Sequence, residues 1–292
     1  MPTILITGAN SFVGKNFIGS SRFKDVEEIS LFDNKPAEIN FSSVDVIIHL
    51  AAIVHQSKKI TESEYFAVNK DLCLSVAGYA KKAGVKHFVF MSTVKVYGES
   101  GLNSKILNED SPCLPDDSYG KSKREAEIAL KQLEDTNFTV SIIRTPLVYG
   151  NGVKANMLNI IKLVDRLPVL PFGTVNNKRS FTYVGNLVAF IDRIIEKRAS
   201  GLFIAKDKDS LSTSELVQLI SKYLGKKVIL IRIPGIFLSI GALFLPKIFN
   251  RLYGSLEFDN SKTLELLDFQ PPYTTNEGIK EMVGAYLVKS EK

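Results

Sequence analysis

Thr93, Tyr119 and Lys123 are the side chains best suited by type and spacing to move a proton. Tyr119 and Lys123 are one helical turn apart, so in a helix they share a face. A tyrosine has a reference pKa near 10, and lowering it by ~3 units for work near neutrality requires roughly 4 kcal/mol. A lysine ammonium within hydrogen-bonding range in a shielded site supplies about that much. We therefore predict that Tyr119 exchanges a proton with a hydroxyl or carbonyl held by Thr93, and that Lys123 lowers the tyrosine pKa.

The spacing of tyrosine and lysine is not specific by itself, because Tyr223 and Lys227 repeat it. That second pair spans Gly225, and glycine is typical of a helix end. Tyr119 differs in context: it follows an apolar strand-like run that ends in Ser92-Thr93, and it precedes a long run with helical period. We therefore place the reactive centre at Tyr119.

A glycine-rich turn follows the first predicted strand, Thr3–Thr7, and opens a helix. Such a turn directs backbone N–H groups and the positive end of a helix dipole at a pyrophosphate, which predicts a dinucleotide cofactor that carries hydride. Ser11 stands where the usual pattern has its middle glycine; it narrows the approach of the phosphates but can hydrogen-bond to them. The residues predicted to contact the cofactor here are Gly8, Asn10, Ser11, Phe12, Val13 and Gly14.

Asp33 ends the second predicted strand, Glu28–Phe32. A carboxylate there accepts hydrogen bonds from a ribose and repels a 2′-phosphate, which favours NAD without excluding NADP. Contact with adenine and capping of the strand are the alternatives for Asp33. The interval from Phe32 to Asp45 barely has room for another strand and helix, so this sheet edge is expected to be abbreviated.

Short β-branched runs alternate with helical patterns, which predicts an α/β fold: a Rossmann-type doubly wound parallel sheet with a smaller, mostly helical C-terminal substrate lobe. Residues 1–151 and 181–206 are expected to form the dinucleotide-binding domain, and residues 152–180 and 207–292 the lobe. The further predicted strands are Val44–Leu50, His87–Ser92, Val140–Arg144 and Gly201–Ala205, and the predicted helices are Tyr65–Ala83, Lys121–Leu133 and Asn156–Arg166.

The composition excludes several classes of protein. The net charge is +6 from 37 basic and 31 acidic residues, without a basic cluster, so no nucleic-acid partner is expected. Cys73 and Cys113 lack metal-like spacing and are expected to be free thiols, and no metal site is predicted. The N-terminus enters a strand at once, which argues against a signal peptide. The uncharged stretch Ile233–Pro246 is shorter than the ~20 residues of a membrane-spanning helix, so we expect a cytoplasmic protein without a transmembrane segment.

Together these motifs strongly resemble the extended short-chain dehydrogenase/reductase family, in particular its NAD-dependent epimerase/dehydratase group that modifies nucleotide sugars. The matching segments are Gly8–Gly14, His49–Ala52, Asn69, Ser92–Gly98, Tyr119–Lys123, Arg144–Gly150, Val153–Asn156, Lys178–Ser180, Arg251–Lys262 and Pro271-Pro272.

The resemblance implies roles for individual residues. Thr93, Tyr119 and Lys123 match the catalytic positions. The further positions that match cofactor contacts are Leu50, Ala51, Ala52, Asn69, Met91 and Pro146. The positions that match substrate contacts are Lys95, Asn156, Arg179 and Arg251, the last three on the nucleotide diphosphate, where an arginine can bind phosphate oxygens through paired charged hydrogen bonds. A possible homodimer is a further implication of the family.

The residues after Thr93 separate the branches of this family. Where dehydratases carry Asp and Glu that expel water, this chain has Val94 and Lys95, so a dehydratase is rejected. Lys95 resembles a branch of surface-polysaccharide pathways that contains UDP-sugar 4-epimerases and 4-ketosugar reductases; a solvated surface charge is its alternative reading. Arg144, at a strand end, is expected to be structural, and His55 is only a candidate near the site.

Three functions stay open. The favoured one is a 4-epimerase of a UDP-hexose or UDP-N-acetylhexosamine. The second is a 4-ketoreductase of a UDP-4-keto-6-deoxy-N-acetylhexosamine that uses the same residues with an exchangeable cofactor. The third, a non-catalytic dinucleotide sensor, would not need Thr93, Tyr119 and Lys123 together. The stretch Ile233–Pro246 is expected to be a helix on the lobe or at a dimer contact, or a membrane-contacting surface if the sugar is lipid-linked.

Overall fold

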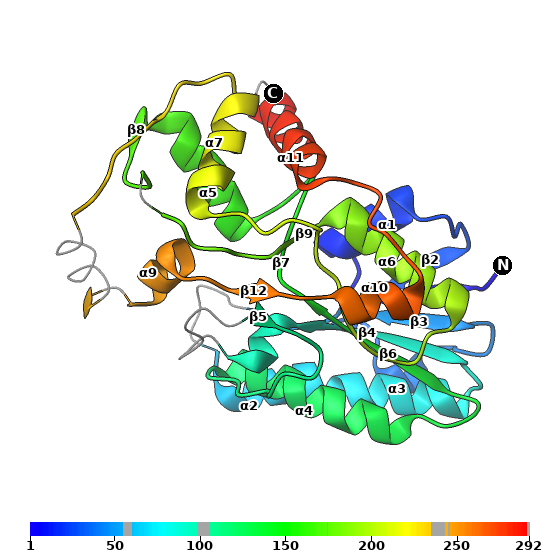
Figure 1. Cartoon of the computed structure of the whole chain (residues 1–292). Helices are drawn as coiled ribbons and strands as arrows, with labels where there is room; N and C mark the ends of the chain where they lie inside the picture. Colours follow the sequence, from blue (N-terminus) through cyan, green and yellow to red (C-terminus); the bar gives the residue numbers. More distant parts are fainter. Residues whose placement is uncertain (55–59, 99–105, 174, 235–242, 245, 291–292) are drawn as a thin grey trace.

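A six-stranded parallel sheet forms the centre of the molecule (Figure 1). The computed structural model describes residues 1–54, 60–98, 106–173, 175–234, 243–244 and 246–290. The strand order is β10-β6-β4-β3-β1-β2, and every pairing is parallel. The strands are β1 (Ile4–Thr7), β2 (Val26–Ile29), β3 (Val46–His49), β4 (His87–Thr93), β6 (Thr139–Thr145) and β10 (Gly201–Ile204).

Helices cover both faces of this sheet. Helices α1 (Phe12–Ser20) and α6 (Val184–Lys197) pack on one face, and α3 (Cys73–Lys82) and α4 (Ser118–Leu133) pack on the other (Figure 1). Because both faces are covered, strand β3 is buried at all four positions. This arrangement confirms the predicted doubly wound α/β fold. Strands β2 and β3 lie on opposite sides of β1, and ligands of open α/β sheets bind beside the carboxyl ends at such a switch point.

The abbreviated sheet edge is confirmed, but the predicted bounds of its strand are wrong. Residues 30–45 contain a single short element, the 3-10 helix η1 (Pro36–Glu38). Strand β2 ends at Ile29 rather than Phe32, because the Ile29 carbonyl accepts hydrogen bonds from the N–H groups of Gly8 and Ala9, where β1 turns into the glycine loop. Phe32 is 99% exposed.

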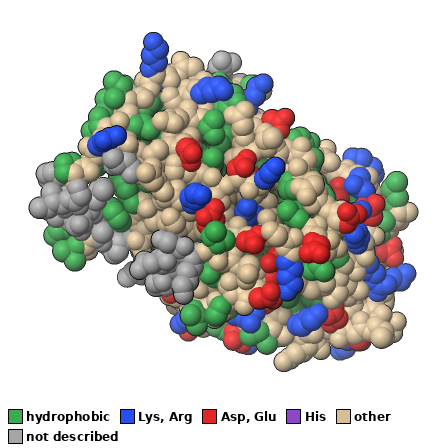
Figure 2. Space-filling view, viewed as in Figure 1, with side chains coloured by type: hydrophobic (Ala, Val, Ile, Leu, Met, Phe, Trp, Pro, Cys, Tyr) green, Lys and Arg blue, Asp and Glu red, His purple; other side chains and the backbone are tan. Residues whose placement is uncertain are grey.

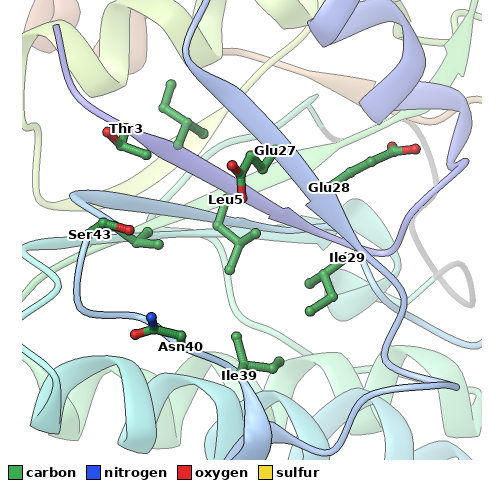
Figure 3. Close-up of a pocket in the computed structure, with 10 residues that line it drawn as sticks. Thr3, Leu5, Glu27, Glu28, Ile29, Ile39, Asn40 and Ser43 are labelled. Carbon is green, nitrogen blue, oxygen red and sulfur yellow. The ribbon is translucent and has the colours of Figure 1, made fainter.

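The short connection leaves a cavity of about 250 Å³ beside strands β1 and β2. Figure 3 shows Leu5 and Ile29 extending from these strands towards Ile39 on the connecting loop, with Asn40 and Ser43 along the same loop. The lining of the cavity includes Ile4 and Leu5, in the first half of β1, and Thr3 just before them. It lies at the β2 edge of the sheet, and its lining includes none of Thr93, Tyr119 and Lys123.

The helix predicted over Tyr65–Ala83 is divided into three parts. Helix α2 (Glu62–Phe66) begins at a capping box formed by Thr61 and Glu64, and α3 forms the last part. Between them, Ala67–Leu72 form a π-helix, η2, which widens the turn. Such widened turns often occur at functional sites. Asn69 lies in this π-helix and is completely buried.

The second half of the chain forms a separate hydrophobic core around α5 (Ala155–Arg166), α7 (Thr213–Tyr223) and α11 (Thr275–Ser290). The predicted division into two domains stays a prediction. The remaining elements are η3 (Val94–Tyr97), β5 (Ile106–Leu107), β7 (Leu147–Tyr149), β8 (Val169–Leu170), β9 (Phe181–Tyr183), β11 (Ile229–Leu230), α9 (Pro246–Tyr253), β12 (Glu257–Phe258) and α10 (Ser261–Leu267).

Two features are absent from the described residues. None of their helices combines the length and apolar character needed to cross a membrane. The same residues contain no group of three or more histidine, cysteine or acidic side chains that could hold a metal ion. Most of the stretch Ile233–Pro246 lies outside the described residues. Figure 2 shows basic and acidic side chains interspersed over the face in view.

Candidate active site

Thr93, Tyr119 and Lys123 meet at the carboxyl end of β4. Thr93 is the last residue of that strand, and Tyr119 and Lys123 lie in the first turns of α4. A side-chain hydrogen bond joins Tyr119 to Thr93. Gly120 makes this approach possible, because a Cβ atom at that position would lie 2.6 Å from the Lys95 carbonyl oxygen. The structure therefore brings together the three residues that the sequence predicted to act together.

Burial opposes the predicted lowering of the Tyr119 pKa, and the effect of Lys123 on this pKa stays a prediction. Burial raises the pKa of the Tyr119 phenol above its usual value, and the charges of Asp117 and Tyr65 raise it further, while the hydrogen bond with Thr93 lowers it. The Lys123 ammonium donates a 2.7 Å hydrogen bond to the Met91 carbonyl. Work near neutrality would therefore require a further positive charge near the phenol to offset its burial.

Lys123 is held in a nearly closed environment. Its side chain is 2% exposed, and its ammonium lies 4.3 Å from the centre of the Phe90 ring. Burial lowers the pKa of Lys123 to about 8, and the nearby Cys73 and Glu127 oppose this shift. A buried ammonium with few water contacts interacts more strongly with a neighbouring dipole or hydroxyl than one in solution.

The glycine turn forms a cradle beside the third strand. Gly8 has φ +97°, and a Cβ atom there would lie 2.7 Å from the backbone nitrogen of Ala51, so only glycine permits this approach. Ser11 caps α1 by accepting a hydrogen bond from the Gly14 N–H at 3.1 Å. Phe12 and Val13 follow in the first turn of α1, where backbone N–H groups point out of the helix. The cradle and helix terminus suit a pyrophosphate.

A carboxylate adjoins this cradle, although it is not the predicted one. The backbone N–H of Asn10, which has φ 63°, donates to the Glu28 carboxylate at 3.2 Å. Asp33 does not end a strand, because β2 stops at Ile29; it lies in the following turn and is exposed. The sequence therefore predicted a carboxylate near the glycine turn, but it identified Asp33 instead of Glu28. Glu28 is exposed on a short edge strand, and no sequence pattern distinguished it.

Asn69 binds protein groups rather than projecting into an open site. Its amide exchanges hydrogen bonds of 2.8 and 3.0 Å with the N–H and carbonyl of Ile53, and donates to the Ser122 hydroxyl at 3.1 Å. Ser122 in turn donates to the Tyr119 carbonyl at 2.9 Å. Asn69 thus fixes the loop after Leu50-Ala51-Ala52 relative to the first turn of α4.

Arg144 forms a buried ion pair behind the site, as expected for a structural residue. Its guanidinium donates to the Glu127 carboxylate at 2.6 and 3.0 Å and lies 4.6 Å from the Tyr97 ring centre. Ser92 also donates to Glu127, at 2.5 Å. Pro146 lies two residues after Arg144, between β6 and β7, and is buried.

Lys95 is paired with an acidic residue that the sequence analysis missed. Its ammonium lies 2.5 Å from one oxygen of Asp117, and the other oxygen caps α4 by accepting the Gly120 N–H at 2.7 Å. The Lys95 side chain is 22% exposed, so its charge is only partly solvated, and its role in substrate binding stays a prediction. An acidic residue two positions before Tyr119, at the start of a helical run, is a recognisable cap signal that could have identified Asp117.

The predicted diphosphate-binding residues are not all brought together. Arg179 donates to the carbonyl oxygens of Asn250 and Gly254 at 3.1 and 2.9 Å, so it anchors the end of α9 that carries the exposed Arg251. Asn156 is exposed in the first turn of α5, and no described contact joins it to the two arginines. His55 lies outside the described residues.

The second tyrosine–lysine pair is separated as predicted. Helix α7 ends at Tyr223, and Gly225 has φ +67°, so Lys227 does not continue the helix. The Tyr223 hydroxyl donates to Asn276 at 2.9 Å. A different aromatic residue, Tyr65, lies beside the reactive centre, with its ring centre 6.3 Å from that of Tyr119. Tyr65 is distant in sequence, and only the folded chain reveals it.

Comparison with known proteins gives consistent matches. The family model described as "NAD dependent epimerase/dehydratase family" matches residues 4–203. The chain is 34% identical to a UDP-glucose 4-epimerase of Vibrio cholerae, over 98% of this chain and 95% of the relative. It is 26% identical to the N-acetyl-alpha-D-glucosaminyl-diphospho-ditrans,octacis-undecaprenol 4-epimerase of Escherichia coli O157:H7, over 99% and 96%. A crystal structure of the UDP-glucuronic acid 4-epimerase of Bacillus cereus with NAD superposes with a TM-score of 0.77 at 19% identity, over 99% of each chain.

Proposed function

The chain belongs to the NAD-dependent epimerase/dehydratase family, and on that premise we propose that it is a NAD-dependent 4-epimerase of a UDP-hexose or UDP-N-acetylhexosamine. The observation that carries the proposal is the meeting of Thr93, Tyr119 and Lys123 at the sheet end that also bears the glycine cradle. A non-catalytic sensor would have no use for this buried arrangement.

The reactive residues divide the work of oxidation at a sugar carbon. Thr93 hydrogen-bonds to Tyr119 and is placed to orient the C4 oxygen of the sugar towards the phenol. Tyr119 accepts the C4 hydroxyl proton at its Oη as the carbon is oxidised, and returns it when the carbon is reduced on the opposite face. Lys123, whose pKa burial lowers to about 8, is held beside them by its hydrogen bond to the Met91 carbonyl.

The residues of the cradle fit a dinucleotide. Gly8, Ser11 and the first turn of α1 would hold the pyrophosphate, and the segment Leu50–Ala52 runs beside them. When bound, NAD supplies the hydride acceptor and a positive charge near the phenol. The Glu28 carboxylate at the Asn10 N–H supports NAD over NADP, because negative charge beside the turn opposes a 2′-phosphate.

The uridine diphosphate is assigned to the lobe. We assign Arg251 to direct phosphate contact and Arg179 to holding the segment that presents it, since its NH1 group donates to two backbone carbonyls. Asn156 is kept as a candidate for the same diphosphate.

A second candidate, a 4-ketoreductase, uses the same three residues. It is favoured over a dehydratase because neither Val94 nor Lys95 has the carboxyl group with which a dehydratase expels water. The two candidates differ in cofactor exchange: an epimerase regenerates its oxidised cofactor in every cycle, whereas a reductase must release it.

The test is the cofactor content of freshly purified protein together with its turnover of a panel of UDP-sugars. An epimerase carries tightly bound dinucleotide and converts a UDP-hexose or UDP-N-acetylhexosamine without added cofactor. Protein that is purified empty and consumes NAD(P)H stoichiometrically with a 4-keto sugar would contradict the epimerase and support the reductase.

A further inference from the structure

The two-stranded sheet of β8 and β11 exposes an apolar face at the end of the molecule that also bears α9 (Figure 1). Val169 and Ile229 are paired in register, and the Ile231 N–H donates to the Leu170 carbonyl at 2.9 Å. Side chains alternate between the two faces of a strand, so Leu170 points to the opposite face, where it is buried. The outer face, called the β8–β11 face below, consists of four aliphatic side chains that are 43–63% exposed: Leu167, Val169, Ile229 and Ile231.

This face differs from the single exposed apolar residues that every soluble protein carries, because its side chains are neighbours on one surface. Exposed apolar residues that are grouped in this way mark a contact with another molecule or with a membrane. Aliphatic side chains have no hydrogen-bonding groups, so the contact must bury them against an apolar partner.

Positive charge borders the β8–β11 face. Residues 216–256 contain six basic residues and no acidic ones, and six is also the net positive charge of the whole chain. Lys227 and Arg232 are exposed just before and just after the outer-face residues of β11, whereas Lys226 pairs with Asp165 at 2.5 Å. Figure 2 shows hydrophobic and basic side chains together at this end of the molecule. The partner should therefore combine an apolar layer with negative charge.

We propose that the β8–β11 face docks on a membrane surface that contains anionic phospholipids. Its aliphatic side chains enter the boundary between headgroups and acyl chains, and Lys227 and Arg232 lie at the headgroup phosphates. The protein then lies on the bilayer without crossing it. This inference goes beyond the proposed function and does not depend on it.

A second copy of this chain fits the same face less well. A symmetric contact places the same patch on both subunits, so the cations that border one face would meet those that border the other. Like charges brought together across an interface oppose its formation, whereas an anionic lipid layer attracts the same cations. The charge around the face therefore favours the lipid surface.

The test is co-sedimentation of the full chain with vesicles of equal parts phosphatidylglycerol and phosphatidylcholine, compared with vesicles of phosphatidylcholine alone. We expect the chain to bind the anionic vesicles more tightly than the neutral ones, and added salt to weaken that binding because it screens the headgroup charge. Binding to neither kind of vesicle at low salt, or equal binding to both, would overturn the proposal.

The apolar contribution is measured with the double variant Ile229→Ser and Ile231→Ser, which leaves the bordering cations in place. It should lower the partition coefficient for anionic vesicles at least about tenfold, since burial of a single isoleucine side chain corresponds to about that factor. The matched control is the double variant Leu266→Ser and Ile18→Ser, because these residues are 57% and 41% exposed on α10 and α1. The control should bind the vesicles as the unchanged chain does.

The electrostatic contribution is measured with the double variant Lys227→Ala and Arg232→Ala. Each cation near an anionic membrane contributes about fivefold, the equivalent of about 1 kcal/mol, so the pair should lower the partition coefficient about 25-fold. The double variant Lys82→Ala and Lys197→Ala removes the same charge from exposed positions on α3 and α6. This control should change binding by less than about twofold, because its cations lie away from the face.

Melting temperatures check that every variant is folded. Equal losses of binding in the β8–β11 variants and in their controls would overturn the assignment of this face. If the unchanged chain ignores the vesicles and the β8–β11 variants lower its sedimentation coefficient, the face joins two copies of the chain and the proposal is wrong. Failure of the unchanged chain to convert any UDP-sugar would overturn the proposed function and leave the membrane proposal standing.

Discussion

Replacing Glu127 by glutamine should destabilise the fold behind the reactive residues. The Glu127 carboxylate accepts hydrogen bonds from Arg144 at 2.6 and 3.0 Å, from Ser92 at 2.5 Å and from Arg124 at 3.0 Å. Ser92 immediately precedes Thr93, so this one carboxylate ties the ends of β4 and β6 to the middle of α4.

The magnitude follows from burial. The side chains of Glu127 and Arg144 are each 1% exposed, so removing one charge leaves the other without its partner and out of water. Breaking such a buried pair costs about 3–5 kcal/mol. The matched control is Glu125→Gln on the same helix, where the carboxylate is 49% exposed and 3.9 Å from Lys70; exposed pairs contribute about 0–1 kcal/mol.

Urea denaturation followed by circular dichroism measures both variants. Glu127→Gln should lower the free energy of unfolding by at least about 3 kcal/mol, and Glu125→Gln by less than about 1 kcal/mol. The double variant Glu127→Leu with Arg144→Met, which replaces the pair by apolar side chains of similar volume, should recover most of the loss. Equal effects of the two single variants would refute the interpretation of Glu127 as the centre of this network.

Further predictions concern chemistry, cofactor and pH. Tyr119→Phe should lower kcat by about 10²–10⁴-fold while bound NAD is retained; an unchanged kcat would rule out Tyr119 as the proton carrier. Gly8→Ala should reduce the NAD content of purified protein, because its Cβ atom would lie 2.7 Å from the Ala51 nitrogen; full retention would contradict the geometry of the cradle. Burial lowers the pKa of His49 to about 3 and that of His87 to about 4, so from about pH 6.5 downwards the unfolded chain binds protons that the folded chain excludes. The free energy of unfolding, measured by urea denaturation, should therefore fall by roughly 2 kcal/mol per histidine between pH 6.5 and pH 5. His87→Asn should make this decrease with pH smaller. An unchanged decrease in the variant would refute the argument.

The parts of the site that depend on local spacing could be predicted from the sequence. The turn from Gly8 to Gly14 is defined by neighbours in the chain, and Thr93 and Tyr119 were identified by their positions at a strand end and a helix start. These features follow from backbone geometry, which short motifs largely determine.

The parts that depend on tertiary packing could not be predicted. The direction of the Tyr119 pKa shift is set mainly by burial, which cannot be derived from the spacing of Tyr119 and Lys123. The π-turn around Asn69 follows a helical pattern in sequence, and only its contacts with Ile53 and Ser122 distinguish it. Fold class was confirmed, but contacts across long sequence separations had to be observed.

The end of strand β2 could not be predicted from the sequence either. Strand β2 ends at Ile29 because two N–H groups of the glycine loop bind its carbonyl, whereas the apolar run continues to Phe32. Apolar character therefore predicted the strand but not its end, and the position of Asp33 was misjudged as a result.

The most direct test of the central claim is the fate of hydrogen at C4. A UDP-hexose labelled with deuterium at C4 is incubated with the purified enzyme without added cofactor, and the product is analysed by chromatography and mass spectrometry. Oxidation and reduction within one site predict the 4-epimer with deuterium retained at C4. A 4-epimer that has lost the label, or no 4-epimer at all, would contradict the account.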